Sequence, residues 1–230
     1  MLRNIKKFMP EIYFKIVSKE ERKEHKVYIN KILDPQNHNK TLSQKNETKE
    51  YFICNYNIEK LKNKILKVVS ESKNDILLYR IFPNQKNNFI LTSFYENLNI
   101  ENNNNEFDIP ENNDFKKLFL GRNGKLKEHV DVHYITDEKK EKTTIKIKCV
   151  NVAHNTLISN IFETLQRHKL TSEFIEIWQI KKSDKKIKSY YEISIILDSI
   201  LPQKEMQSMK DDFIRYLQLY IKSMSIFDMV

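Results

Sequence analysis

Apolar residues recur along this chain at two spacings, which predict a mixture of strands and helices. Alternating apolar residues are typical of half-buried strands, and apolar residues three and four apart are typical of amphipathic helices. The strands predicted in this way are 51–55, 75–82, 89–95, 129–136, 143–152, 173–180 and 188–197. The predicted helices are 18–33, 58–72, 157–165 and a last helix that opens at Pro202, with 115–120 as a shorter candidate.

The order of these elements predicts an α+β fold made of ferredoxin-like βαββαβ modules. A strand, a helix and two strands follow one another over residues 51–96, and the same order returns from residue 144. The second copy continues into a further helix and a last strand predicted over 225–230. This split βαβ pattern characterises ferredoxin-like folds. We therefore predict a partial module at 51–96 and a full module at 144–230.

The N-terminal segment 1–34 is predicted to be a helical arm. Ser18 is placed to cap the helix and Glu21 to complete a capping box. Asp34-Pro35 should end the helix, because proline disfavours helical geometry in the preceding residue. The apolar side is expected to consist of Val27, Ile29, Ile32 and Leu33.

Three other segments are predicted to connect these parts. Residues 35–50 are polar and predict a mobile linker. Residues 97–114 are rich in asparagine, a low-complexity composition that predicts a disordered insertion. Residues 115–143 are then a connector that contains one strand of a hairpin.

Glycine is scarce, and its scarcity excludes several enzyme classes. The chain of 230 residues has only Gly121 and Gly124. A dinucleotide-binding fingerprint needs three glycines in a short span, and the phosphate-binding loop and the G-x-S-x-G elbow also need more than this chain offers. A complete enzyme of the common nucleotide-using classes is therefore not expected.

The net charge of +9 leaves two interpretations open. A basic patch for nucleic acid or an anionic membrane is one of them. A generally lysine-rich surface is the other, and we favour it because the lysines are spread through every segment and arginine, the better residue for base edges, is scarce. A basic nucleic-acid-binding α+β module remains the alternative function.

Cysteine use and hydropathy bear on the compartment. Cys54 and Cys149 form no C-x-x-C pair, so no disulfide framework or cysteine zinc site is predicted. No apolar run approaches the roughly 20 residues that cross a bilayer, and the basic start lacks the apolar core of a secretory signal. We expect a cytoplasmic or mitochondrial protein without a membrane partner.

Two groups of residues are candidates for chemistry. His129, Asp131 and His133 would share one strand face and could ligate a metal in a small hydrolase, but we favour an exposed face of a half-buried strand, which needs nothing else. His154 lies at a strand-to-helix turn where Asn155 or Thr156 is expected to cap the helix. A helix N-terminus of this kind can hold an anion, but a polar loop histidine is the simpler interpretation. Trp178 is interpreted as sheet core.

One segment of the arm resembles a known family. Met9-Pro10-Glu11-Ile12-Tyr13-Phe14, followed by Ser18-Lys19-Glu20-Glu21-Arg22 and His25, is similar to a segment near the start of the large NAD-specific glutamate dehydrogenases. The resemblance implies a tethering arm in which Tyr13 and Phe14 are packing anchors. The later element order, best over 144–197, looks like the ACT-type regulatory modules of that family.

The resemblance implies a regulatory or oligomerisation region, or a truncated copy, of an enzyme that oxidatively deaminates glutamate with NAD. The catalytic lysine and the NAD-binding domain would lie further along a longer chain, so no catalytic or cofactor-binding residue is expected here. Other subunits or downstream catalytic domains are the implied partners, with an amino-acid effector at His154, Asn155 and Thr156. ACT modules commonly have glycine at this turn, where Asn155 stands, so a purely structural module is equally open.

Overall fold

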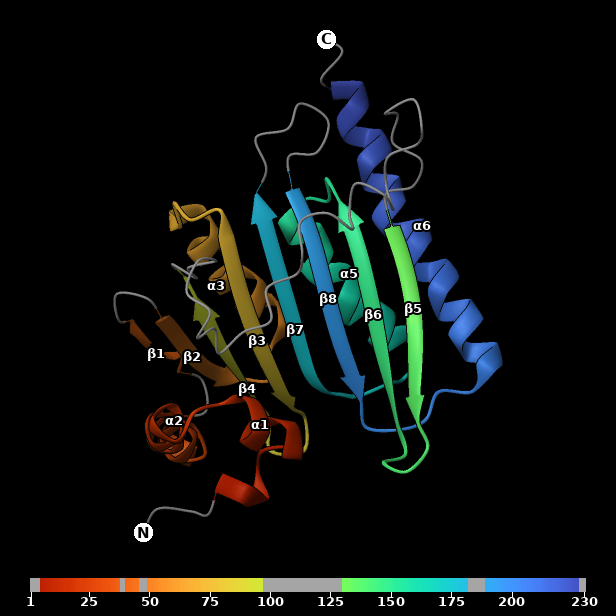
Figure 1. Cartoon of the computed structure of the whole chain (residues 1–230). Helices are drawn as coiled ribbons and strands as arrows, with labels where there is room; N and C mark the ends of the chain where they lie inside the picture. Colours follow the sequence, from red (N-terminus) through yellow and green to blue (C-terminus); the bar gives the residue numbers. More distant parts are fainter. Residues whose placement is uncertain (1–4, 38–39, 46–48, 97–129, 182–188, 228–230) are drawn as a thin grey trace, which may run out of the picture.

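The chain forms one antiparallel sheet of eight strands with helices on both faces (Figure 1). The computed structural model describes residues 5–37, 40–45, 49–96, 130–181 and 189–227. The predicted insertion at 97–114 and the short helix at 115–120 lie outside these residues. The α+β class predicted from the sequence is confirmed.

Most strands lie where the alternating pattern predicts them. They are β1 (Leu42–Lys45), β2 (Lys49–Asn55), β3 (Ile76–Asn84), β4 (Phe89–Tyr95), β5 (Val130–Asp137), β6 (Lys142–Val150), β7 (Ser172–Lys181) and β8 (Ser189–Leu197). The helices are α1 (Glu11–Ile16), α2 (Lys19–Ile32), α3 (Ile58–Glu71), α5 (His154–Arg167) and α6 (Gln203–Phe227), with short 3₁₀ turns η1 (Ile5–Lys7) and η2 (Pro35–Asn37).

The strand order relates the two halves of the sheet by an approximate two-fold axis. The order is β1-β2-β4-β3-β7-β8-β6-β5. We call β1–β4 with α3 the N-terminal unit, and β5–β8 with α5 and α6 the C-terminal unit. In each unit the helix follows the second strand, and the third strand lies at the inner end. The pairing of β3 with β7, which we call the seam, joins the units antiparallel over Ile76–Ile81 and Ile175–Ile180.

The C-terminal edge of the sheet differs from the prediction. The strand predicted over 225–230 is wrong, because α6 continues to Phe227 and residues 228–230 lie outside the described part. The edge position beside β6 belongs to β5, which precedes β6 in the chain. Met209, Phe213 and Leu217 are all buried, and their four-residue spacing favours a helix.

The opposite edge of the sheet, formed by β1, also differs from the prediction. Part of the linker predicted at 35–50 is ordered as η2 and β1, and β1 pairs antiparallel with β2. Only Leu42 in this strand is strongly apolar, so alternation gives little signal. The strand is held by backbone pairing to β2, which needs no apolar side chain.

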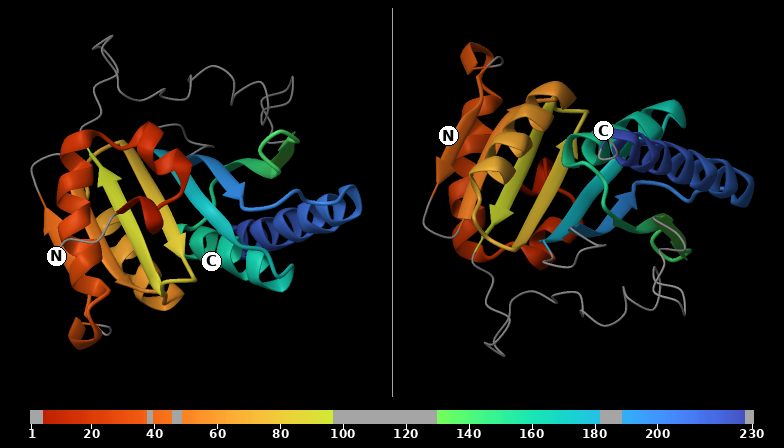
Figure 2. Two further views of the ribbon diagram at one scale, coloured as in Figure 1. Left: turned by 90° about the horizontal axis from the view of Figure 1, so that it is seen from below. Right: turned by 90° about the horizontal axis from the view of Figure 1, so that it is seen from above.

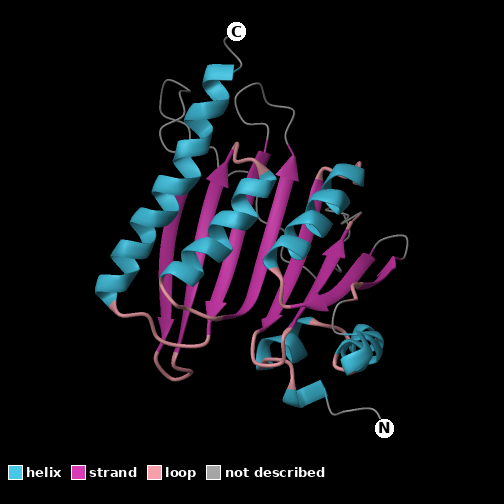
Figure 3. Cartoon of the chain, turned by 180° about the vertical axis from the view of Figure 1, so that it is seen from behind, coloured by secondary structure: helices cyan, strands magenta, loops and turns pink. Residues whose placement is uncertain are grey.

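One face of the sheet is covered by α3, α5 and α6 (Figure 3). The side chains between these helices and the strands form the main core, which draws on both units. Its buried members include Phe52, Leu61, Ile65, Tyr79, Ile147, Leu157, Ile161, Ile177, Ile193, Met209 and Phe213. Cys54 and Cys149 are buried in the same core as free thiols.

The arm, formed by α1 and α2, lies against the opposite face of the N-terminal unit (Figure 2). The predicted capping box at Ser18 and Glu21 is confirmed in both directions. The predicted apolar side is partly wrong, because Val27 is 41% exposed. The buried side consists of Glu21, His25, Ile29 and Ile32, a helical spacing that includes two polar residues.

Candidate functional site

A cleft of about 380 Å³ lies where the two units meet on the helix-covered side of the sheet. One wall comes from the N-terminal unit, at the turn from β2 to α3 and the turn from β3 to β4. The other wall comes from the end of α5 and the loop into β7. The lining residues are Tyr56, Ile58, Gln85, Phe162, Leu165, Gln166, Lys169, Leu170, Thr171 and Ser172.

The N-terminal wall is held by local hydrogen bonds. The Asn57 side chain caps α3 by accepting a hydrogen bond from the Lys60 backbone N–H at 2.9 Å. Gln85 donates through Nε2 to the Tyr56 hydroxyl at 2.9 Å, and the Tyr56 backbone N–H donates to the Asn88 carbonyl. Burial raises the pKa of the Tyr56 hydroxyl, which is therefore a neutral donor or acceptor at physiological pH.

The C-terminal wall depends on the way α5 ends. Lys169 has a left-handed backbone (φ 54°), and the Leu170 N–H donates back to the Leu165 carbonyl at 2.9 Å. This closure of the last helical turn is usually made by glycine, which carries no Cβ to clash. The turn sends the chain directly into β7. It thereby places Lys169, Leu170 and Thr171 on the cleft.

The lining chemistry is suited to binding. Among the described residues that line the cleft, Lys169 is the one charged side chain, and none is His, Cys, Asp or Glu. Hydroxyl groups of Tyr56, Thr171 and Ser172 are present, and the Thr171 hydroxyl donates to Asp198. These groups can hold a ligand through hydrogen bonds and through the charge of Lys169.

Of the effector turn predicted at His154, Asn155 and Thr156, only the Thr156 side chain is described, and it is not among the described residues that line this cleft. The capping prediction was wrong, because α5 begins at His154 with Ala153 as its N-cap and without a side-chain cap bond. Thr156 is buried inside the helix. The left-handed residue before the helix is Asn151 (φ 55°), so the glycine-like position lies four residues ahead of Asn155.

The equivalent turn in the N-terminal unit does reach the cleft. Tyr56 and Asn57 lie between β2 and α3 as Val152 and Ala153 lie before α5, so the approximate symmetry relates the two turns. Sequence reasoning placed a candidate only in the second copy. The repeated strand-helix order over 51–95 was the available signal for the first turn.

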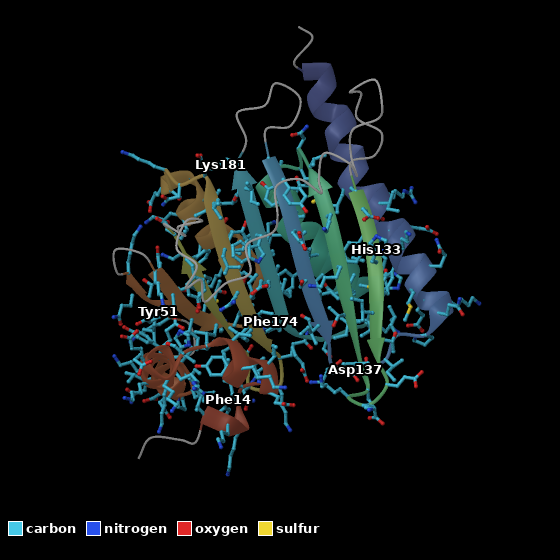
Figure 4. The ribbon with its side chains drawn as sticks, in the orientation of Figure 1. Phe14, Tyr51, His133, Asp137, Phe174 and Lys181 are labelled. Atoms are coloured by element: carbon cyan, nitrogen blue, oxygen red, sulfur yellow. The ribbon has the colours of Figure 1, made fainter. Side chains whose placement is uncertain are left out.

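The metal hypothesis is tested only in part. Asp131 and His133 share a face of β5, as alternation predicts, with His133 Nε2 at 2.8 Å from Asp131 Oδ2. The His133 side chain is 67% exposed at the sheet edge, far from the arm (Figure 4). His129 lies outside the described residues. Within those residues, no three His, Cys, Asp or Glu side chains gather closely enough to hold a metal.

A second polar cluster, which sequence reasoning did not single out as a site, lies beneath the arm. His25 is fully buried, with Nδ1 at 3.0 Å from the Tyr13 hydroxyl and Nε2 at 3.5 Å from the Ser93 hydroxyl. Burial lowers the pKa of His25 to about 4, so its ring is neutral at physiological pH. All three side chains are closed off from solvent, which leaves them a role in docking the arm.

Some of the surface lysines form ion pairs with carboxylates. Lys49 pairs with Glu21 at 3.1 Å, Lys142 with Glu173 at 2.5 Å and Lys148 with Glu192 at 3.6 Å. Trp178 is buried beside Leu78 and Tyr95, as expected of a core residue. Such pairing reduces the charge available to a phosphate backbone.

The part of the chain that the structure describes contains no helix with the length and apolar character to cross a bilayer. Comparisons of the chain with models of protein families, with curated proteins and with solved structures gave no match.

Proposed function

We propose that this chain is a non-catalytic regulatory or subunit-contact region of the kind that precedes the catalytic domains of large NAD-specific glutamate dehydrogenases, or a truncated copy of one. The observation that carries the proposal is the pairing of two similar units in one sheet. In each unit, the strand-helix-strand-strand order resembles that of an ACT-type regulatory module. Pairs of such units create a junction at which a small molecule can act on both.

The arm supports this proposal by the way it docks. Four rings are in sequential contact from the arm through both units: Phe14 on Tyr13, Tyr13 on Phe82, and Phe82 on Phe174, with centroids 5.1, 5.2 and 5.1 Å apart. Arg80 of β3 adds a hydrogen bond to the Ile16 carbonyl at 3.0 Å. Tyr13 and Phe14 are therefore packing anchors, as the resemblance implies.

The cleft supports a binding role rather than a catalytic one. Its described lining has one cation and several neutral polar groups. Oxidation of glutamate would require NAD and a catalytic lysine in domains beyond this region. Under this proposal the partners of the chain are those domains or other subunits, and the cleft is the effector site.

The proposal is tested by capture from the cells that make this protein. Tagged chain should co-purify with an NAD-specific glutamate dehydrogenase polypeptide identified by mass spectrometry, and a variant that lacks residues 1–34 should capture less. The purified chain alone should not reduce NAD with glutamate. Turnover by the chain alone, or capture that contains no dehydrogenase, would overturn the assignment.

Nucleic-acid binding is the competing function, and the same purified chain tests it. Filter binding to duplex DNA and to single-stranded RNA at low and moderate salt should give little retention at either. Affinity that falls steeply with salt would instead indicate phosphate contacts and favour the basic-module alternative.

A further inference from the structure

We infer that the cleft binds a small carboxylate with an apolar body and does not require an ammonium group on it. The inference rests on the proposed regulatory function, because it names the ligand of that effector site. It departs from the amino-acid effector that the resemblance implies. The chemistry of the lining side chains gives the reason.

The floor of the cleft is apolar and comes from both units. Phe162 and Leu165 of α5 are nearly buried, and Ile58 of α3 and Leu170 lie partly exposed beside them. A branched or aromatic group can cover this floor and remove it from water. The cleft volume of about 380 Å³ falls within the range of small-molecule sites.

The charge balance of the lining selects for an anion. Lys169 provides an ammonium at the cleft, and Gln85, Gln166 and Ser172 provide neutral donors. A carboxylate would be bound by a charge-assisted hydrogen bond from Lys169. A ligand ammonium would have no carboxylate among the described lining residues, and Asp198, which accepts from Thr171, lies outside them. An amino acid would therefore lose hydration at its ammonium without an ionic partner.

A ligand in this cleft contacts both units at once. Its apolar part would touch Ile58 on one side and Phe162 on the other, and its carboxylate would lie at Lys169. Because only the paired units present both walls, binding favours the intact seam. Occupancy of the cleft should therefore raise the stability of the paired state by RT ln(1 + L/Kd), where L is the free ligand concentration.

Three probes with one carbon skeleton test the inference on the full chain. They are 4-methylpentanoate, leucine, which adds an ammonium, and 4-methylpentanamide, which removes the negative charge. Isothermal titration calorimetry should show one site for 4-methylpentanoate, with the amide about tenfold weaker because it loses one charge-assisted hydrogen bond. Leucine should also be about tenfold weaker, because its ammonium loses hydration without an ionic partner. Tighter binding of leucine, or no binding of 4-methylpentanoate, would overturn the inference.

Matched lysine variants locate the site. Lys169→Met removes the ammonium but keeps the length of the side chain, and it should weaken 4-methylpentanoate about tenfold. Lys23→Met changes an exposed lysine on the arm and should leave binding unchanged. Equal loss in both variants, or no loss in Lys169→Met, contradicts the inference. Capture of the dehydrogenase is measured separately, so the proposed function can stand or fall on its own.

Discussion

At the residue scale, the arm is held by a histidine that a surface helix would normally expose. His25 contacts Tyr13 and Ser93 through its two ring nitrogens, and its ring packs edge-on against Tyr51 at 5.0 Å. Glu21 and Lys49 form an ion pair nearby, and both influence the charge of the imidazole. The neutral ring is satisfied in this pocket, whereas a protonated ring would lose its hydration. Protonation of His25 at low pH should therefore weaken the docking of the arm.

The pH dependence of stability should reveal this coupling. An unfolded chain protonates His25 below its ordinary pKa of 6.5, but the folded chain does so only near pH 4. The neutral His25 ring therefore contributes its full stabilisation above pH 6.5. This stabilisation is lost as the pH falls from 6.5 to 4, and the free energy of unfolding should decrease by about 3 kcal/mol in total. Urea unfolding at pH 7 and pH 5 measures the effect.

Two variants separate His25 from other groups in that measurement. His25→Gln should be less stable at pH 7 but should lose less stability between pH 7 and pH 5. His133→Gln changes an exposed imidazole far from the arm and is the matched control. The pKa of Glu21 is lowered below 4.5 by Lys49 and Ser18 despite its burial, so its stabilising contribution is constant between pH 7 and pH 5 and is lost only below that range. The same pH dependence in both variants would show that another group is responsible.

At the scale of elements, strands and helices followed the apolar spacing wherever side-chain burial decides the structure. The Phe89–Tyr95 strand matched at both ends, and the helix at 58–72 ended within one residue of α3. The edge strand β1 was missed because backbone pairing leaves no apolar pattern. The last strand was wrong because the prediction of a βαββαβ module overrode a helical spacing that continued through α6.

The cleft was harder to predict than the elements that form it. Its walls come from turns that are far apart in the sequence. Tyr56 on one wall and Ser172 on the other are more than a hundred residues from each other. They meet only because β3 pairs with β7, a contact that local sequence patterns do not encode. The repeated strand-helix order identifies one candidate turn in each unit. Which of these turns faces the other unit depends on how the two units pair.

The seam also contains an ion pair whose contribution can be measured. Arg80 donates through Nε to Glu176 at 2.8 Å, and its guanidinium is also bonded to the Ile16 carbonyl. The Arg80 side chain is only 7% exposed. Arg80→Met should lower the free energy of unfolding by about 2 kcal/mol, because it leaves Glu176 and a backbone carbonyl without this donor.

A double-mutant cycle tests whether these two side chains act together. Glu176→Leu alone should also destabilise the chain, since it leaves the Arg80 cation without its carboxylate. The double variant should cost less than the sum of the single changes, because neither charge is then left unpaired. Strictly additive losses, measured by urea unfolding, would show that the pair contributes no coupling across the seam.

At the scale of the whole molecule, the two units share one sheet and one core. The main core runs without interruption from Phe52 and Leu61 in the N-terminal unit to Ile193 and Phe213 in the C-terminal unit. The arm adds a second contact through Phe82 and Phe174 on the opposite face. Figure 4 labels Phe174 beside the arm. Separating the units would expose apolar surface on both faces of the sheet.

This shared core predicts that both units unfold together. Trp178, the single tryptophan, lies in β7 at the seam, so its fluorescence reports on the pairing of the units. Far-ultraviolet circular dichroism reports on all helices and strands. The two signals should give coincident urea transitions, as two-state unfolding requires. A fluorescence change well before the loss of secondary structure would indicate that the seam opens first.

The approximate two-fold axis has one more consequence. Paired units of this kind, if made as separate chains, would associate by mass action and come apart on dilution. In this protein the chain connects them, so each unit experiences the other at a fixed effective concentration. The cleft between them should therefore keep its two walls together at any abundance of the protein, and its occupancy should depend on the level of ligand alone.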